Sequence, residues 1–385
     1  MIRLTLPAVA LLLTVGTSYG QIQFQAVALP GLTSAQKSLF TQGQSIFTKT
    51  WTAQTGLGPI YNDVGCTRCH PNGNGSFARG QIIGEGTLQY ADGGPNIQIK
   101  SLPRFVAETI PTNVPVAFRR SMTTRGLGLI GNIPDQSILA LQASQTSSDT
   151  TTAGQARIVV DAVTGETRVG RIGQKCQHPN STSFAADAFL NEIGITTPFF
   201  PNENAAFNNP ANLNNNPFPG VNDSGNSVIL AGHFMDLSAP PKSSNQPRTT
   251  AQKNSVSRGS NLFSTIGCAT CHNPTWTTGS STGVAALDNQ IISPYSDFLL
   301  HDMGASGDQI QQGTNSNGQP IPGSWMRTTP LWGVSTNTNL WHDGTANSVT
   351  AAISKHAGQA AGALSRYNSL SSSSKQDLLN FLNSL

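Results

Sequence analysis

Cys66-Thr67-Arg68-Cys69-His70 and Cys268-Ala269-Thr270-Cys271-His272 are two copies of one motif, Cys-x-x-Cys-His, and they use four of the five cysteines in the chain. This spacing is typical of c-type haem attachment, in which both thiols bond to the haem and the histidine becomes an axial ligand of its iron. The alternatives are a redox dithiol, a disulfide or a zinc site, although a four-cysteine zinc site would leave both histidines without a role. The sequence therefore predicts two covalently bound haem c groups, held by Cys66, Cys69, Cys268 and Cys271, with His70 and His272 as proximal ligands.

The N-terminus has the features of a secretory signal. A short positive start, Met1-Ile2-Arg3, precedes an apolar run over residues 4–17, and Ser18-Tyr19-Gly20 offers small residues for cleavage. We therefore expect residues 1–20 to be a cleaved signal peptide and the protein to be periplasmic or secreted. An uncleaved membrane anchor is the alternative, but the run is short for a span of about 20 residues. No later stretch is long and apolar enough to span a membrane.

Composition limits the fold and the partners. Only 11% of the residues are charged, and the net charge is +3 without a strongly basic patch, so nucleic acid is not an expected partner. Hydrophobic residues make up 37% of the chain, beside 38 glycines and 23 prolines. This mix indicates short elements joined by long loops, in which buried haem supplies part of the apolar surface.

The same order of elements precedes both motifs. Residues 34–49 form a predicted helix capped by Ser34, and residues 255–266 form another, directly before the second motif. A helix followed by a haem motif is the entry to a cytochrome c domain. We predict a mainly α fold with two cytochrome c-like domains, at residues 34–140 and 249–385, with their haems near the domain interface. A helix from about Ser374 would close the second domain.

Residues 141–248 are predicted to be an irregular insertion. Residues 157–161 and 167–169 flank the turn Thr164-Gly165-Glu166, which indicates a β-hairpin. Residues 181–193 have the pattern of a helix. The segments 144–152 and 201–226 are rich in Ser, Thr, Asn, Pro and Gly and are predicted to be loops.

Several blocks of sequence resemble the di-haem oxidoreductase family, whose members are also labelled thiol oxidoreductases. The blocks are residues 56–63, 126–130, 169–173, 191–196, 295–304 and 327–333, followed by His342-Asp343-Gly344. They run over nearly the whole chain after the signal. The family is similar to the bacterial di-haem cytochrome c peroxidases. The chain departs from it at Gln174 and Cys176, where an aromatic and a small residue are usual, and it lacks a recognisable peroxidase distal block after the first motif. Cys176 is an unpaired thiol that we expect to be buried.

The resemblance implies the sixth ligand of the second haem. In the peroxidase-like relatives this ligand follows His-Asp-Gly by one short helix, which leads here to His356. A histidine implies a bis-histidine haem of low potential, because thioether ligation raises the potential. A surface histidine at a helix end is the alternative. His342 itself is expected to hold a propionate or a loop carbonyl.

No residue is singled out as the sixth ligand of the first haem. His301 and Met303 lie in an apolar block, where they either pack against a haem edge or bind iron. His178 and His233 could approach the first haem, but nothing in the sequence favours either of them.

The relatives imply three further features. An indole between the haems can carry an electron, and Trp332 and Trp341 are the candidates, although either could be a core residue. Arg327 could pair with a haem propionate through its planar fork. A calcium ion lies between the domains in the relatives, and here its oxygen ligands would come from the backbone at Asn337 and Asn339.

Two functions remain open. As an enzyme, the second haem would take electrons from a small redox protein or a quinol-chain donor and pass them to the first haem, which keeps an open position for peroxide or another small oxidant. Glu85, Glu108 and Glu192 are the candidate acid–base groups. As an electron carrier, both haems would be six-coordinate, although the length of the chain argues against this function. Dithiol exchange is not expected, because haem attachment would leave only Cys176.

Overall fold

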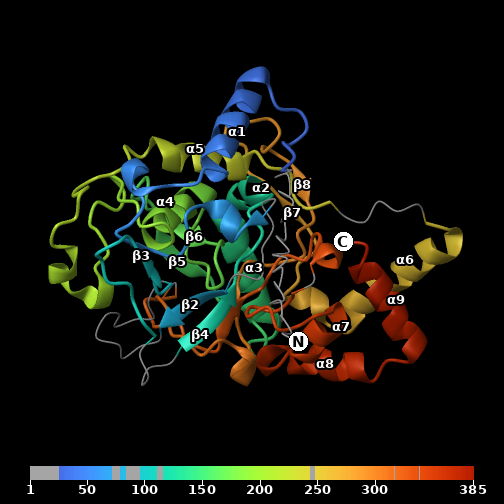
Figure 1. The fold of residues 1–385 in the computed structure, drawn as a ribbon. Coiled ribbons are helices and arrows are strands. Elements are labelled where there is room, and N and C mark those ends of the chain that lie inside the picture. Colours follow the sequence, from blue (N-terminus) through green and yellow to red (C-terminus); the bar gives the residue numbers. More distant parts are fainter. Residues whose placement is uncertain are drawn as a thin grey trace, which may run out of the picture.

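The computed structural model describes residues 26–71, 79–83, 96–110, 116–242, 248–315, 317–337 and 339–385. The predicted signal peptide and Glu85 lie outside these residues. Two packed helix pairs dominate the described chain: α1 (Ser34–Phe47) with α5 (Asn226–Asp236), and α6 (Thr250–Thr265) with α9 (Ser372–Leu382). Figure 1 shows the first pair at the top and the second at the right. The predicted mainly α fold is confirmed.

The first pair is built around a glycine. A Cβ atom on Gly43 would overlap the carbonyl oxygen of Leu230, so only glycine lets α1 and α5 approach this closely. One turn later, Phe47 packs against Phe234 of α5, with ring centroids 4.8 Å apart. The other side of Phe47 faces His70, at 6.4 Å between ring centroids. The crossing therefore puts an aromatic ring beside the first motif histidine.

The second pair repeats this arrangement. A Cβ atom on Gly259 would overlap the carbonyl oxygen of Asp377 in α9. Four residues on, Phe263 packs against Phe381 at 5.3 Å and faces His272 at 6.2 Å between ring centroids. We call the part of the protein built on α1 and α5 the first half and the part built on α6 and α9 the second half. Each half is closed by the second helix of its pair. The closing helix of the first half, α5, comes from the predicted insertion.

Capping boxes set the starts of α1 and α6. Thr33, rather than the predicted Ser34, is the N-cap of α1, because its side chain accepts from the backbone of Gln36 and the Gln36 side chain bonds back. Thr249 and Gln252 do the same for α6, which therefore begins before the predicted start at residue 255.

The described chain has five further α-helices. They are α2 (Leu127–Gly131), α3 (Asp135–Ser148), α4 (Ser181–Asn191), α7 (Val349–Ser354) and α8 (Ala361–Asn368). The helix predicted at 181–193 is confirmed, with Asn180 as its N-cap. The loop predicted from residue 144 was wrong as far as Ser148. There the hydroxyls of Thr146 and Ser147 bond to carbonyls four residues back, which lets these residues remain in a helix.

The strands of the described chain form antiparallel pairs. These are β1 (Ile60–Tyr61) with β3 (Lys100–Ser101), β2 (Arg79–Ile83) with β4 (Val116–Arg120), β5 (Arg157–Val160) with β6 (Thr167–Gly170), β7 (Trp276–Thr277) with β8 (Ile291–Ile292), and β9 (Leu300–Asp302) with β10 (Trp325–Arg327). The predicted hairpin is β5–β6, with Arg157 opposite Gly170. Single 3₁₀ turns are η1 (Ala53–Thr55), η2 (Cys66–Arg68), η4 (Ala206–Asn208), η5 (Pro210–Leu213), η6 (Cys268–Thr270), η7 (Gly304–Ser306), η8 (Val334–Thr336) and η9 (Gly358–Ala360).

Two apolar cores lie around the helix pairs. The larger contains α1 together with α3, α4, α5 and β6, and the smaller contains α6, α8 and α9. Residues of the predicted insertion therefore share one core with the first predicted domain. The boundaries at residues 140 and 248 remain predictions. Among the described residues, no helix combines the length and apolarity that a membrane crossing requires.

The glycine crossing can be tested with Gly259→Ala. The added methyl group would overlap the Asp377 carbonyl, so we expect the free energy of unfolding to fall by about 1–3 kcal/mol, the usual cost of overpacking. Chemical denaturation of the haem-loaded protein measures this change. Ser257→Ala, on the exposed side of α6, is the control and should stay within about 0.5 kcal/mol of the wild type. A fully stable Gly259→Ala variant would show that α6 and α9 do not need this close approach.

Candidate functional site

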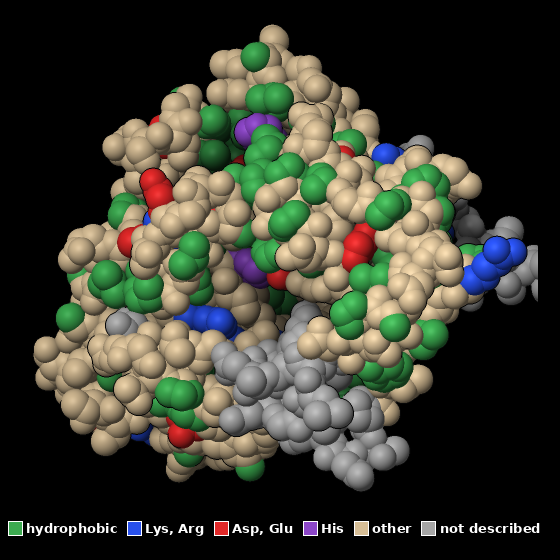
Figure 2. Space-filling view, turned by 90° about the vertical axis from the view of Figure 1, so that its left-hand side faces the viewer, with side chains coloured by type: hydrophobic (Ala, Val, Ile, Leu, Met, Phe, Trp, Pro, Cys, Tyr) green, Lys and Arg blue, Asp and Glu red, His purple; other side chains and the backbone are tan. Residues whose placement is uncertain are grey.

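One cavity of about 1310 Å³ is lined by both Cys-x-x-Cys-His motifs. It exceeds the roughly 300–1,000 Å³ typical of a site for one small ligand. Each motif begins in a 3₁₀ turn, η2 or η6, which brings the two cysteines and the following histidine to the cavity wall. Figure 2 shows a hollow in one face of the molecule, with histidine and Lys or Arg side chains beside it. The space and its lining fit the two haems that the sequence predicts.

Backbone carbonyls orient both motif histidines. Nδ1 of His70 lies 2.7 Å from the carbonyl oxygen of Met122, and Nδ1 of His272 lies 2.9 Å from that of Tyr295. A proton held on Nδ1 leaves Nε2 with a free lone pair, which is the tautomer that a metal requires. Burial lowers the pKa of both rings to about 4, so both are neutral near pH 7. The two histidines are therefore ready to act as proximal ligands.

His356 lies opposite His272. It follows α7, and its Nδ1 lies 3.0 Å from the carbonyl oxygen of Ala352 and 3.1 Å from that of Ile353, which again leaves Nε2 free. Its ring centroid is 6.4 Å from that of His272. Two imidazoles on opposite faces of one iron, each with a metal–nitrogen bond of about 2 Å, have ring centroids roughly 6 Å apart. The separation fits the ligand pair that the sequence predicts, and burial lowers the pKa of His356.

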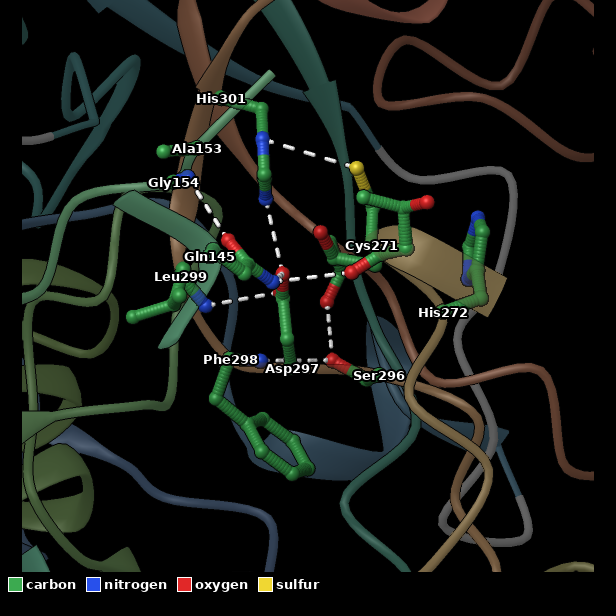
Figure 3. A network of polar contacts seen from close by, with 12 residues as sticks. Gln145, Ala153, Gly154, Cys271, His272, Ser296, Asp297, Phe298, Leu299 and His301 are labelled. Atoms are coloured by element: carbon green, nitrogen blue, oxygen red, sulfur yellow. Dashed lines mark hydrogen bonds and ion pairs between the residues drawn. The ribbon is translucent and has the colours of Figure 1, made fainter. Parts of the chain in front are cut away.

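His301 belongs to a buried polar network beside the second motif (Figure 3). Its Nε2 lies 2.8 Å from Oδ2 of Asp297, and its Nδ1 lies 3.0 Å from Oε1 of Gln359. Gln145 also donates to Asp297, at 3.0 Å. Burial disfavours charge on both partners, but the Asp297 carboxylate raises the pKa of His301 well above its usual value. Both ring nitrogens of His301 are thus engaged by side chains of this network.

The same network contains three potential metal ligands. Sγ of Cys271, an oxygen of Asp297 and a nitrogen of His301 all lie within 4.8 Å of one another. A cysteine bonded to a haem vinyl group has no thiolate left to offer a metal. The predicted attachment and a metal ion here therefore exclude each other, and the following His272, aimed into the cavity, favours attachment.

The thiols lack the properties of a redox dithiol. Burial raises the pKa of Cys66 and Cys69 to about 12 and that of Cys268 to about 11, whereas reactive dithiols have lowered values. Cys176 is fully buried, as expected, with its Sγ 3.3 Å from the carbonyl oxygen of Phe298 and a pKa raised by burial to about 12. None of these four groups is poised for thiol exchange.

Glu192 lines the cavity near the first motif. Burial, with a smaller contribution from Asp187, raises its pKa to about 7, although hydrogen bonds from Asn96 and Asn62 oppose this shift. Glu108 is also buried, but it accepts from the backbone of Gln98 at 2.7 Å and does not line the cavity. Of the two candidate acid–base groups within the described chain, the cavity includes Glu192.

Three arginines of the cavity wall have no carboxylate partner among the described residues. These are Arg120, Arg327 and Arg366. Arg327 donates from Nε to the carbonyl oxygen of Gly173 at 2.7 Å, and Nη1 reaches that of Thr328 at 3.3 Å. Its Nη2 lies 3.1 Å from Sδ of Met122, so its hydrogen bonds go to backbone carbonyls and a sulfur. Haem propionates are the anions that such cations would pair with.

The two tryptophan candidates lie in different places. Trp332 is buried in the larger core, while the preceding Leu331 packs with the smaller one, so Trp332 lies where the two halves meet. Trp332 lines the cavity, and its indole Nε1 is buried without a hydrogen-bond partner among the described residues. Trp341 instead packs on His356, with ring centroids 5.2 Å apart.

The remaining histidine and methionine candidates differ in whether they line the cavity. Nε2 of His342 lies 3.0 Å from the carbonyl oxygen of Ser306, the last residue of η7. His178 and Met303 line the cavity, whereas His233 does not.

Sequence reasoning missed the groups that orient the histidines. The carbonyls of Met122, Tyr295 and Ala352 leave no side-chain signal. Asp297 had a weak sequence signal, because it lies inside the family block at 295–304. Gln145 had none, because it lay in a predicted loop.

Comparisons with known proteins add a family. Residues 99–385 match the family described as "Di-haem oxidoreductase, putative peroxidase"; the match includes the second haem motif and begins after the first. A comparison with curated proteins finds no match.

Similar solved structures include hydrazine synthase from Kuenenia stuttgartiensis, a MauG-like protein associated with microbial copper homeostasis, and the diheme peroxidase BthA from Burkholderia thailandensis. Their sequences are 13%, 13% and 14% identical, with TM-scores of 0.43, 0.40 and 0.43. The alignments cover 99%, 94% and 90% of this chain and 100%, 93% and 86% of theirs.

Substitution of His356 tests its predicted ligand role. In His356→Ala the second iron loses an axial ligand, so we expect a low-spin EPR signal of the oxidised protein to be replaced by a high-spin one. In His356→Met the signal should stay low-spin while the reduction potential rises, because thioether ligation favours ferrous iron. His233→Ala, outside the cavity, is the control. An unchanged low-spin signal in His356→Ala would rule out this ligand.

Proposed function

The chain belongs to the di-haem oxidoreductase family, and on that premise we propose that electrons enter at the second motif and reduce peroxide, or another small oxidant, at the first. When bound, the two haems supply one-electron transfer and, at an iron with an open position, reduction of the oxidant. The chain's own residues hold the haems, keep one axial position open and supply protons.

The observation that carries this proposal is the asymmetry between the motifs. His272 has a second imidazole, His356, at ring-centroid distance 6.4 Å. Among the described residues, the ring contact of His70 is with Phe47, and no second imidazole lies opposite it. A saturated iron suits electron transfer, whereas an open position suits chemistry. The asymmetry therefore favours an enzyme over an electron carrier with two saturated irons.

Glu192 is the proposed proton donor. Reduction of hydrogen peroxide to two waters consumes two electrons and two protons. With a pKa raised to about 7, the Glu192 carboxyl is partly protonated at neutral pH and can release and regain a proton there. Asp187 and His178, whose side chains lie 3.7 Å apart on the same cavity wall, can relay protons to it.

Trp332 is the proposed route for electrons between the two motifs. Its indole is buried where the larger core meets the smaller one, and it lines the shared cavity. Arg327 is the proposed partner of a haem propionate, because its charge lacks a carboxylate partner in the described chain.

The proposed location rests on the predicted signal peptide and the two haem motifs. We propose covalent attachment of both haems outside the cytoplasm after cleavage of residues 1–20, since this attachment chemistry belongs to that compartment. The electron donor would then be a small redox protein or a component of the quinol chain.

Peroxide reduction by the pre-reduced protein tests the function, with haem content and EPR recorded alongside. We expect a high-spin signal beside a low-spin one, and peroxide turnover that falls as the pH rises through about 7, because Glu192 then loses its proton. Glu192→Gln should lower the rate by about 10²-fold or more and abolish this pH dependence. Glu203→Gln is the matched control, because burial raises the pKa of Glu203 to about 8 outside the cavity.

Two low-spin signals that persist on half-reduction, with no oxidant turnover, would instead identify an electron carrier. Unchanged turnover in Glu192→Gln would remove Glu192 from the mechanism without affecting the asymmetry argument.

Trp332→Phe tests the electron route separately. Phenylalanine keeps most of the packing but is far harder to oxidise, so we expect stopped-flow spectra to show slower re-oxidation of the second haem by peroxide while the resting EPR spectrum is retained. Trp51→Phe is the control, because Trp51 is buried and its Nε1 also lacks a partner, but it lies outside the cavity. Equal rates in both variants would exclude Trp332 as the route.

A further inference from the structure

We propose that the guanidinium of Arg120 is the cation that joins the two halves of the protein, at the segment where family resemblance implies a calcium ion, and that no calcium binds there. This inference concerns the interface between the halves and does not depend on the oxidant or on the proposed function.

The hydrogen bonds of Arg120 cross between distant parts of the chain. Arg120 is the last residue of β4, and its Nη1 donates to the carbonyl oxygen of Asn339, 219 residues away. Its Nη2 lies 3.3 Å from Oδ1 of Asn337, and its backbone N–H donates to the carbonyl oxygen of His342 at 2.7 Å. Nε reaches the carbonyl oxygen of Ser121 at 3.3 Å. The guanidinium therefore uses the two asparagines predicted to bind calcium.

The rest of the side chain packs on the turn that follows. A Cβ atom on Gly344 would lie 3.5–3.7 Å from three carbons of the Arg120 side chain, which is ordinary contact. Arg120 thus lies along His342-Asp343-Gly344. Burial lowers its pKa, but an arginine stays protonated in proteins. Since no carboxylate pairs with it in the described chain, oxygen dipoles alone offset its charge.

Calcium does not fit the same oxygens. It takes six to eight oxygen ligands at about 2.3–2.6 Å, commonly with carboxylates among them. Here N–H groups of Arg120 already point at the carbonyl oxygen of Asn339 and at the side-chain oxygen of Asn337, and a divalent ion at the backbone oxygens of this segment would lie against a positive guanidinium. The nearby Asp343 carboxylate accepts from the backbone and hydroxyl of Thr345, at 2.9 and 2.7 Å. A fixed side-chain cation thus takes the place of an exchangeable ion.

The position of Arg120 makes it a positioning residue for the site. Two residues on, the Met122 carbonyl orients His70, and the Ser121 hydroxyl donates to the carbonyl oxygen of Cys69 at 2.6 Å. On the other half, Trp341 packs on His356 beside the His342 carbonyl that Arg120 holds. Arg120 therefore connects two segments of the site. One is the segment after β4, whose Met122 carbonyl orients His70, and the other is the loop whose Trp341 packs on His356.

The test compares calcium dependence in the haem-loaded wild type with the effect of removing the guanidinium. We expect no stoichiometric calcium by elemental analysis. Melting temperature and EPR spectrum should be the same in millimolar CaCl₂ and in excess EGTA. Arg120→Gln should lower the melting temperature by on the order of 5 °C and alter the EPR signal of the haem at His70, because the strand that orients this ligand loses its anchor. Arg120→Lys, which keeps the charge, should recover part of both changes.

Arg104→Gln, at an exposed arginine, is the matched control and should change neither quantity. One bound calcium per protein, or a saturable rise in wild-type melting temperature on adding calcium, would overturn the proposal. So would an Arg120→Gln variant with wild-type melting temperature and spectrum. If Arg120→Gln does not fold, the wild-type calcium content and EGTA response still decide the question.

Discussion

The close crossing of two helices at a glycine is the constraint on which the rest of the structure depends. At Gly43 and again at Gly259 the partner backbone occupies the space where a side chain would be. Because the helices approach this closely, the phenylalanine one turn later, Phe47 or Phe263, is clamped between the partner helix and the motif histidine. A motif histidine held on one side by an aromatic ring and at Nδ1 by a carbonyl has little freedom to turn. Each half thus fixes its histidine with the same physical device.

The two halves differ in what lies on the far side of that histidine. In the second half, α7 and the loop after it bring His356 opposite His272, and Trp341 packs on His356. In the first half, the cavity wall near His70 includes Glu192, whose burial favours the protonated carboxyl near neutral pH. The two halves thus share their helix packing but differ in the side chains that face the motif histidine, and the proposed division of roles rests on this difference.

Buried charge at the centre of the molecule is handled by pairing or by backbone dipoles. Arg119 and Lys175 share Asp308, which links residues before the second motif to residues after it, and Arg171 is paired with Asp135. Arg120 and Arg327 instead donate mainly to oxygens of the backbone and of Asn337. Cations without carboxylate partners give the cavity a positive wall, which suits a cofactor that carries carboxylates.

The sequence alone determined the two haem motifs, the mainly α fold, the hairpin at β5–β6 and the closing helix α9, because all of these are local patterns of spacing or periodicity. Family resemblance also implied His356, one short helix after His342-Asp343-Gly344. Only the tertiary structure showed that α5, beside a predicted linker, closes the first half, and that Arg120 reaches Asn337 and Asn339. It also placed Met122, Tyr295 and Ala352 as the carbonyls that orient the histidines. Such contacts join residues far apart in the chain or use backbone atoms that every residue carries, so nothing in the local pattern can reveal them.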